Sequence, residues 1–253
     1  MEFQPRLIFA GRCVDIGGIF VQIDDGPVGN ENVPKTFKTA VQVGSAGVEG
    51  DAVLVAVGRE PVTEGLGLDA LGVEMGEDGV LDTDDEARTS AEHAFTVGDV
   101  TGDPMLAHAA MAGGEVAADV IAGEPAALDH RAVPAAVFTD PETGAVGMTA
   151  PEAEDAGFET VVGEMALRAS GRAMTLDERE GFVRLVADAD EEFVLGARTV
   201  GPEASELIAE VGLAIEMDAR LEDIAGAIHT HPTLSEAVRE AAMAARGEAI
   251  HTM

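Results

Sequence analysis

The hydrophobic and polar positions of this chain change their period along its length. Residues 51–57, DAVLVAV, form an almost continuous apolar run, which is typical of a strand buried on both faces of a parallel sheet. Later apolar runs are more mixed, and an antiparallel hairpin is expected where the acidic residues 188–191 separate the last two of them. The pattern predicts strands in the C-terminal half at 133–139, 159–167, 181–187 and 193–200.

Apolar residues also recur at helical spacing. Leu207, Ile208, Val211 and Ile215 make one stripe that should face the core. The string Thr149-Ala-Pro-Glu152 has the pattern of a capping box and predicts the start of a short helix. Further helices are expected at 105–121, 221–224 and 237–246. The predicted fold is therefore α/β in its first part, followed by an α+β domain.

The N-terminal part carries less readable pattern. Glycines and prolines divide residues 1–48 into short pieces, with strands expected at 7–10 and 19–23. No Gly-x-Gly-x-x-Gly occurs there. Residues 65–70, GLGLDA, satisfy a relaxed dinucleotide fingerprint, but they neither leave a strand directly nor open a long helix. We expect a short connector there, with Leu66, Leu68 and Leu71 packed inward.

The charge of the chain is extreme. Asp and Glu outnumber Lys and Arg by 48 to 15, which gives a formal net charge of −33. Such a surface repels nucleic acid and anionic membranes, and it is typical of proteins from salt-loving organisms. The Debye length falls to about 3 Å at 1 M salt, so we expect the fold to need molar salt. Because no apolar run could span a bilayer and no signal-peptide pattern is present, a cytoplasmic location is expected.

The stretch 228–237, IHTHPTLSEA, is the first candidate site. It places His231 before a proline, expected in a first helical turn, and Glu236 close by, where it is expected to fold back toward His231. An imidazole oriented by a carboxylate is a proton-transfer unit. A simpler interpretation is a capping box of Thr233 and Glu236 with both histidines on the surface, and the two interpretations are compatible.

A second candidate site follows a short predicted strand, Phe95 to Val97. This strand should deliver Gly98 and Asp99 to the C-terminal edge of an open α/β sheet, where ligands bind. Gly98 permits close approach of the backbone, and Asp99 would accept a hydrogen bond from a polyol hydroxyl. The helix after Met105 would present free N–H groups to an electron-rich ligand.

Several strings resemble one family. IHTHPTLSEA resembles the C-terminal active-site signature of the flavoprotein pyridine nucleotide-disulfide oxidoreductases, and within them the dihydrolipoamide dehydrogenases. TVGDVTGDPMLAHAA, at 96–110, resembles their second flavin-binding motif. The apolar run ending in Gly58-Arg59-Glu60-Pro61 resembles the close of their nicotinamide-binding domain. AVFTDPETGAVGMT and LGARTVGPEASELI resemble their dimerisation domain, so the resemblance runs from about residue 51 to the C-terminus.

The resemblance implies roles for the matching positions. His231 would be the general base that removes a proton from a dihydrolipoamide thiol, and Glu236 would orient it. The bond between His231 and Pro232 is expected to be cis, as in the family. The residues implied to contact FAD are Asp99, Met105, Leu106, Ala107 and His108, and Gly58 is implied to lie near NAD.

It also implies an organisation and a set of partners. Residues 1–58 would end in a remnant of the nicotinamide domain, 59–130 would be the second FAD-binding segment, and 131–253 the dimerisation domain. The fold would thus be a remnant of FAD- and NAD-binding Rossmann-like domains followed by an α+β dimerisation domain. The family pairs as a homodimer, with the imidazole of one subunit facing the flavin and disulfide of the other. A lipoyl-bearing acyltransferase of a 2-oxoacid dehydrogenase complex is the further partner implied.

The chain departs from the family at its redox centre. Its one cysteine is Cys13, and the second member of a Cys-x-x-x-x-Cys pair would fall at Gly18. The first flavin motif is also absent from these 253 residues. We therefore interpret the sequence as the C-terminal half of a dihydrolipoyl dehydrogenase-like enzyme, inactive alone, whose other half lies on a separate N-terminal chain or is lost. The alternatives are a non-catalytic dimerisation or assembly module, and another disulfide reductase, such as one for glutathione or mercuric ion.

Overall fold

The structure is a computed structural model of residues 1–253. It describes the backbone of the strands within 14–50, and residues 59–76, 79–102 and 104–251 in full. The chain divides into two compact units, Met1–Glu60 and Pro61–Met253. The predicted strands at 7–10 and 51–57 lie outside the described residues, as do Cys13 and Gly58.

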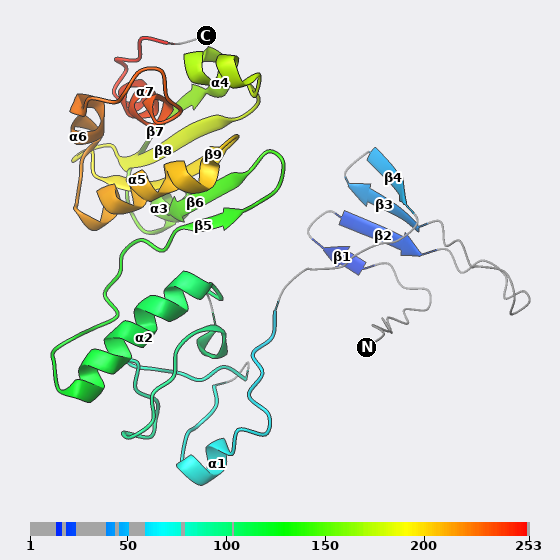
Figure 1. Ribbon diagram of the computed structural model, residues 1–253, viewed down its shortest axis with the longest axis vertical. Helices are drawn as coiled ribbons and strands as arrows, with labels where there is room; N and C mark the ends of the chain where they lie inside the picture. Colours follow the sequence, from blue (N-terminus) through cyan, green and yellow to red (C-terminus); the bar gives the residue numbers. More distant parts are fainter. Residues whose placement is uncertain are drawn as a thin grey trace, which may run out of the picture. The chain divides into compact units, whose positions relative to one another are not determined.

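The first unit contains a four-stranded antiparallel sheet. Its strands follow one another in space in chain order, and each pairs with the next (Figure 1). The strand expected at 19–23 is confirmed, whereas its three neighbours were not expected. The strands are β1 (Val14–Ile16), β2 (Ile19–Ile23), β3 (Thr39–Val43) and β4 (Ala46–Gly50).

The second unit begins with a segment built mainly of loops. It contains the short helix α1 (Leu68–Leu71), the 3₁₀ turn η1 (Asp99–Thr101) and the long helix α2 (Ala107–Ala122). A small core of Val73, Leu81 and Ala91 stabilises the loops.

Two expectations for this segment are wrong. Leu66 and Leu71 are exposed, and only Leu68 of the three packs against the small core. That core has only three buried residues, so it offers little apolar surface for further leucines. The predicted strand at 95–97 is reduced to a single bridge between Arg88 and Phe95. A strand needs a continuous ladder with a neighbour, and the described residues around Phe95 supply only this one pairing.

A five-stranded antiparallel sheet with spatial order β5-β6-β9-β8-β7 follows. All four predicted strands of this half are confirmed, and the acidic turn joins β8 to β9 as an antiparallel hairpin. Thr143–Gly147 is an additional strand. The strands are β5 (Ala135–Val137), β6 (Thr143–Gly147), β7 (Thr160–Ala166), β8 (Phe182–Asp188) and β9 (Val194–Val200).

Six helical segments accompany this sheet. The helices predicted from the capping box at Thr149, from the apolar stripe at 207–215, and at 221–224 and 237–246 are confirmed. In chain order they are α3 (Ala150–Asp155), η2 (Leu167–Ala169), α4 (Gly171–Leu176), α5 (Ala204–Glu216), α6 (Leu221–Gly226) and α7 (Glu236–Ala245).

Helices α5 and α7 pack on one face of the sheet. The strand register places Gly163 of β7, Leu185 of β8 and Ala197 of β9 side by side on that face. A Cβ at Gly163 would collide with the Ala241 carbonyl oxygen, so glycine is what lets α7 lie directly on β7. The apolar stripe of α5 enters the same buried cluster, as its spacing predicted. The main core therefore supports α7, the helix that begins at the first candidate site.

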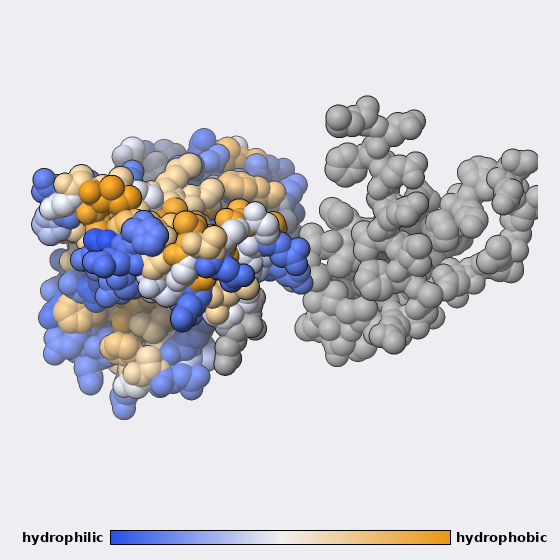
Figure 2. All heavy atoms as spheres, turned by 90° about the horizontal axis from the view of Figure 1, so that it is seen from below, coloured by the Kyte–Doolittle hydropathy of each residue, from blue (hydrophilic) through white to orange (hydrophobic). Residues whose placement is uncertain are grey.

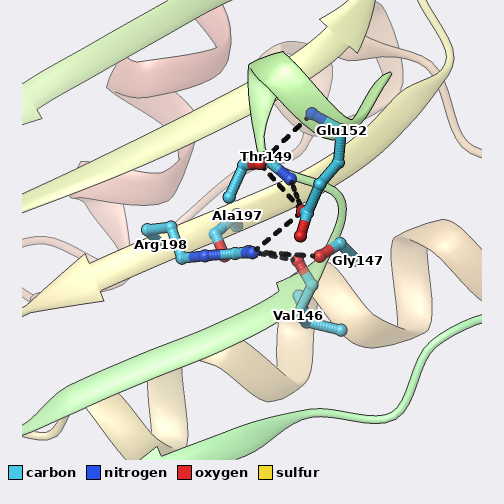
Figure 3. A network of polar contacts seen from close by, with 6 residues as sticks. All are labelled: Val146, Gly147, Thr149, Glu152, Ala197 and Arg198. Atoms are coloured by element: carbon cyan, nitrogen blue, oxygen red, sulfur yellow. Dashed lines mark hydrogen bonds and ion pairs between the residues drawn. The ribbon is translucent and has the colours of Figure 1, made fainter. Parts of the chain in front are cut away.

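Arg198 makes a network of polar contacts on the other face of the sheet. Its guanidinium donates to the carbonyl oxygens of Val146, Gly147 and Ala197 and lies 3.8 Å from the Glu152 carboxylate (Figure 3). Glu152 also accepts from the backbone N–H of Thr149 at 2.7 Å, while the Thr149 hydroxyl accepts from the Glu152 N–H. The predicted capping box is therefore present, and it connects the start of α3 to the β6–β9 pair.

The described part of the chain contains no helix long and apolar enough to cross a membrane. On the face shown in Figure 2, hydrophilic residues surround smaller groups of apolar ones.

Candidate active site

The loop between α6 and α7 carries the first candidate site. Helix α6 ends at Gly226, and α7 begins at Glu236. The bond between His231 and Pro232 is cis, as expected. Pro232 lies before α7 rather than in its first turn, which corrects the sequence-based placement, and Glu236 is the first helical residue. The loop thus presents His231 at the entry of a helix that is fixed on the core.

His231 and Glu236 are brought together by this loop. His231 Nδ1 lies 2.9 Å from Glu236 Oε1, so the expected pairing is confirmed. A carboxylate only accepts hydrogen bonds, so Nδ1 carries the proton and Nε2 is left as a base. Nε2 has no hydrogen-bond partner among the described residues, and the His231 side chain is 78% exposed. The pair can therefore accept a proton from an approaching group.

The carboxylate of Glu236 is held from two sides. Its second oxygen, Oε2, accepts from the backbone N–H of Thr233 at 2.8 Å. Partial burial disfavours the charged form, but the Thr233 N–H, the His231 imidazole and the charge of His251 outweigh it and lower the pKa of Glu236. Glu236 is therefore held as a carboxylate, the form that orients His231.

Only one of the two hydrogen bonds of the predicted Thr233–Glu236 capping box is present. Glu236 reaches back to the Thr233 N–H, as the acidic member of a capping box does. The Thr233 hydroxyl, however, donates to the Thr230 carbonyl oxygen at 2.6 Å instead of serving the helix. The residue at the N-cap is Ser235, which makes no side-chain cap. Glu236 thus combines a backbone contact with its contact to the imidazole.

His229, the other histidine of the motif, has a largely buried side chain, which corrects the interpretation that placed both histidines on the surface. Its side chain is 9% exposed, and its Nε2 lies 2.8 Å from Glu210 Oε1 of α5. Its Nδ1 lies 3.2 Å from the Ala227 carbonyl oxygen. Sequence reasoning missed this contact, because nothing in the local pattern singles out a glutamate on another helix. His229 fixes the loop on α5 and leaves His231 at the surface.

The second candidate site surrounds the start of α2. Gly98 has φ 83°, and a Cβ there would lie 3.1 Å from Ala110 Cβ, so the turn before Asp99 needs glycine. The Asp99 side chain is exposed and has no hydrogen-bond partner among the described residues. Helix α2 begins at Ala107 without a side-chain cap, which leaves its first N–H groups open.

A hollow of about 430 Å³ lies beside these residues. Its wall includes Gly98, Thr101, Pro104 and His108. His108 is partly engaged already, since its Nε2 lies 2.6 Å from the Pro134 carbonyl oxygen. Met105 and Leu106 are half-buried, and Ala107 is exposed. Of the predicted flavin contacts, His108 lines this hollow, together with Gly98, the residue before Asp99, whereas Asp99 and residues 105–107 are not part of its wall. Gly58 lies outside the described residues.

Comparison with known proteins gives the family. The dimerisation domain of the pyridine nucleotide-disulphide oxidoreductases matches residues 133–242, and the pyridine nucleotide-disulphide oxidoreductase domain matches residues 19–114. The chain belongs to the pyridine nucleotide-disulphide oxidoreductase family. The second match begins upstream of residue 51, so the relationship reaches further toward the N-terminus than the motifs indicated.

Individual relatives refine this result. The chain is 71% identical to dihydrolipoyl dehydrogenase 2 of Haloarcula marismortui over 79% of its own length and 42% of that protein. It is 40% identical to the dihydrolipoyl dehydrogenase of Thermus scotoductus over its whole length and 58% of that protein. The crystal structure of LpdA from Mycobacterium tuberculosis matches with a TM-score of 0.71 and 32% identity, over 81% of this chain and 45% of that one. The chain thus spans only about two-fifths to three-fifths of the length of these relatives.

Proposed function

We propose that this chain carries the base-bearing half of a dihydrolipoyl dehydrogenase, which oxidises dihydrolipoamide thiols to a disulfide with electrons passing via FAD to NAD. The observation that carries the proposal is the pair of His231 and Glu236, in which Nδ1 is bound to a carboxylate and Nε2 is free on an exposed ring. Relatives of this chain at 71% and 40% identity are named dihydrolipoyl dehydrogenases, which supports the proposal.

The chemistry assigned to the pair is proton transfer. Nε2 of His231 takes the proton of a dihydrolipoyl thiol, and the resulting thiolate attacks one sulfur of a redox disulfide, releasing the other sulfur as a thiolate. Glu236 stabilises the imidazolium while it carries this proton. The second dihydrolipoyl thiol gives its proton to the released thiolate and attacks the lipoyl sulfur of the mixed disulfide, which closes the lipoyl disulfide and leaves the redox pair reduced. Over the whole reaction the dithiol loses two electrons and two protons; NAD⁺ takes both electrons and one proton as a hydride, and the other proton passes from the imidazolium to solvent.

The residues at the start of α2 fit a flavin. When bound, FAD supplies the two-electron relay between the reduced disulfide and NAD⁺. Asp99 would bind a ribitol hydroxyl, and Met105, Leu106, Ala107 and His108 would lie along the ring. The glycine turn at Gly98 and the open N–H groups of α2 support this assignment. Gly58 remains the proposed contact to NAD.

A second subunit is part of the proposal. Ile228, next to His229, is fully exposed, and so for the most part are two further large apolar residues, Leu213 of α5 and Met217 directly after it. A partner subunit at this surface would remove these side chains from water. The dimerisation-domain match supports a homodimer, and we place His231 of one subunit at the redox disulfide of the other. These 253 residues contain one cysteine, so they do not by themselves supply both cysteines of that disulfide. The lipoyl group would arrive on an acyltransferase of a 2-oxoacid dehydrogenase complex.

The decisive experiment is complementation across the subunit interface. The Haloarcula marismortui relative, with the histidine aligned to His231 replaced by glutamine, is refolded with this chain in molar KCl, and NADH formation from dihydrolipoamide and NAD⁺ is followed. We expect this chain to restore activity, and the variant H231Q to restore none. Equal rates with both chains, or robust NADH production by this chain alone with added FAD, would contradict the proposal.

The absence of a cysteine pair favours one alternative, a non-catalytic dimerisation or assembly module. Flavin retention separates the two functions. A catalytic remnant should bind FAD and purify yellow, whereas the module should be a colourless stable dimer. Replacing dihydrolipoamide by reduced glutathione in the complementation assay tests the other alternative, a different disulfide reductase of the family.

A further inference from the structure

Helix α7 carries two carboxylates on one face with the same bonding pattern. Glu236 and Glu240 are four residues apart, which places them on adjacent turns. Oε2 of Glu236 accepts from a backbone N–H, and its Oε1 contacts the Nδ1 of His231. Oε2 of Glu240 likewise accepts from the backbone N–H groups of Ile250 and His251, at 3.1 and 3.0 Å. Its Oε1 lies 3.3 Å from His251 Nδ1.

The carboxylate of the second pair, Glu240, is more deeply buried than that of Glu236. The Glu240 side chain is 6% exposed, and burying a carboxylate is unfavourable unless its oxygens are satisfied. Burial alone would raise the pKa of Glu240, but the His251 N–H and imidazole and the Ile250 N–H outweigh it and lower the pKa. Arg239 Nη1 adds a cation 3.8 Å from Oε1. Glu240 therefore binds the C-terminal segment 248–251 as a charged group.

This arrangement makes the C-terminal segment a wall of the His231 site. Ile250 and His251 line a hollow of about 290 Å³ together with His231 and Glu236. The side of the hollow formed by η2 and α4 contributes the uncharged residues Ser170 and Gly171. The titratable and charged residues around it are His229, His231, Glu236, Arg239, Glu240 and His251.

We propose that His251 is a positioning residue for His231: Glu240 holds the His251 imidazole in the hollow that Glu236 also lines, where the imidazolium form of His251 favours the carboxylate that orients His231. The inference rests on the proposed function only in taking His231 to be the base of the reaction. The charge of His251 is one of the causes that lower the pKa of Glu236, which agrees with this arrangement.

The test titrates Glu236 directly. The carboxyl carbon signal of Glu236 is assigned by its absence in E236Q and followed against pH by NMR in the full chain. In H251Q, which keeps a polar side chain but removes the cation, we expect the pKa of Glu236 to move up toward the ordinary glutamate value. The matched control is H93Q, which removes an exposed histidine outside the hollow and should leave the titration unchanged.

Salt dependence distinguishes positioning by charge from a purely structural role. The difference in the pKa of Glu236 between H251Q and the unmodified chain should shrink as KCl is raised above the lowest concentration at which both fold. The reason is that salt screens the interaction between the imidazolium form of His251 and Glu236. A merely structural contact would give the same difference at every KCl concentration. A Glu236 titration that is identical in H251Q and H93Q would overturn the proposal.

Amide exchange tests the role of Glu240. In the unmodified chain, the N–H groups of Ile250 and His251 should exchange slowly, and in E240A roughly tenfold or more faster, because each loses a charged acceptor. E178Q, which changes an exposed glutamate elsewhere, is the control. Exchange at the rate of an unfolded peptide in the unmodified chain would contradict the proposal. Neither measurement requires turnover, so failure here is separate from failure of the proposed function.

Discussion

His229 on the loop and Glu210 on α5 meet through Nε2 and Oε1 at 2.8 Å, nineteen residues apart in the chain. This contact fixes one end of the loop that carries His231. Because the His229 ring is almost completely buried, its polar atoms depend on these partners rather than on water.

Replacing Glu210 by alanine should therefore destabilise the C-terminal domain. The buried imidazole loses its side-chain partner, and we expect the free energy of unfolding to fall by about 1–3 kcal/mol. Denaturant unfolding in molar KCl measures this. E206A, an exposed change one turn earlier on α5, should stay within about 0.5 kcal/mol of the unmodified chain. Equal losses in both variants would show that the contact contributes nothing.

Acid should destabilise the domain through the two carboxylates of α7. The pKa values of Glu236 and Glu240 are lower in the folded chain than the ordinary value of 4.5. Their ionised forms therefore stabilise the fold above pH 4.5, and this contribution is lost as the pH falls through the folded-state values. Unfolding midpoints at fixed KCl between neutral pH and pH 3 should fall less steeply for E240Q than for E178Q. A common slope would speak against this linkage.

The capping box at the start of α3 should be measurable by itself. T149A removes the hydroxyl that accepts from the Glu152 N–H, and we expect a loss of about 0.5–2 kcal/mol in the free energy of unfolding. T149S keeps the hydroxyl and should retain most of that stability. If T149S is as unstable as T149A, the effect comes from the threonine methyl group instead.

Salt should stabilise the whole chain. A net charge of −33 makes the folded state repel itself in dilute buffer, and molar KCl screens this repulsion. We expect Tm to rise steadily between 0.1 and 3 M KCl, as followed by circular dichroism. An unchanged Tm over this range would refute the requirement for salt.

The regular elements of the C-terminal half could be predicted because each has a local cause. The stripe of α5, the Thr149 capping box and the β8–β9 hairpin depend on residues a few positions apart, and all three are present. The pairing of His231 with Glu236 belongs to the same class, since five residues and one proline decide it. Where local pattern had no partner, as at Phe95, the predicted strand did not form.

The sequence by itself therefore determined the family motifs, the acidic surface and the His231–Glu236 pair. Only the tertiary structure decided that His229 turns inward to Glu210, that Glu240 binds residues 250 and 251, and that His251 reaches the His231 hollow. These contacts join elements that are distant in sequence, and their geometry follows from how α5 and α7 pack on the sheet. Periodicity records which face of a helix is buried, but it does not record which side chain of another element will meet it.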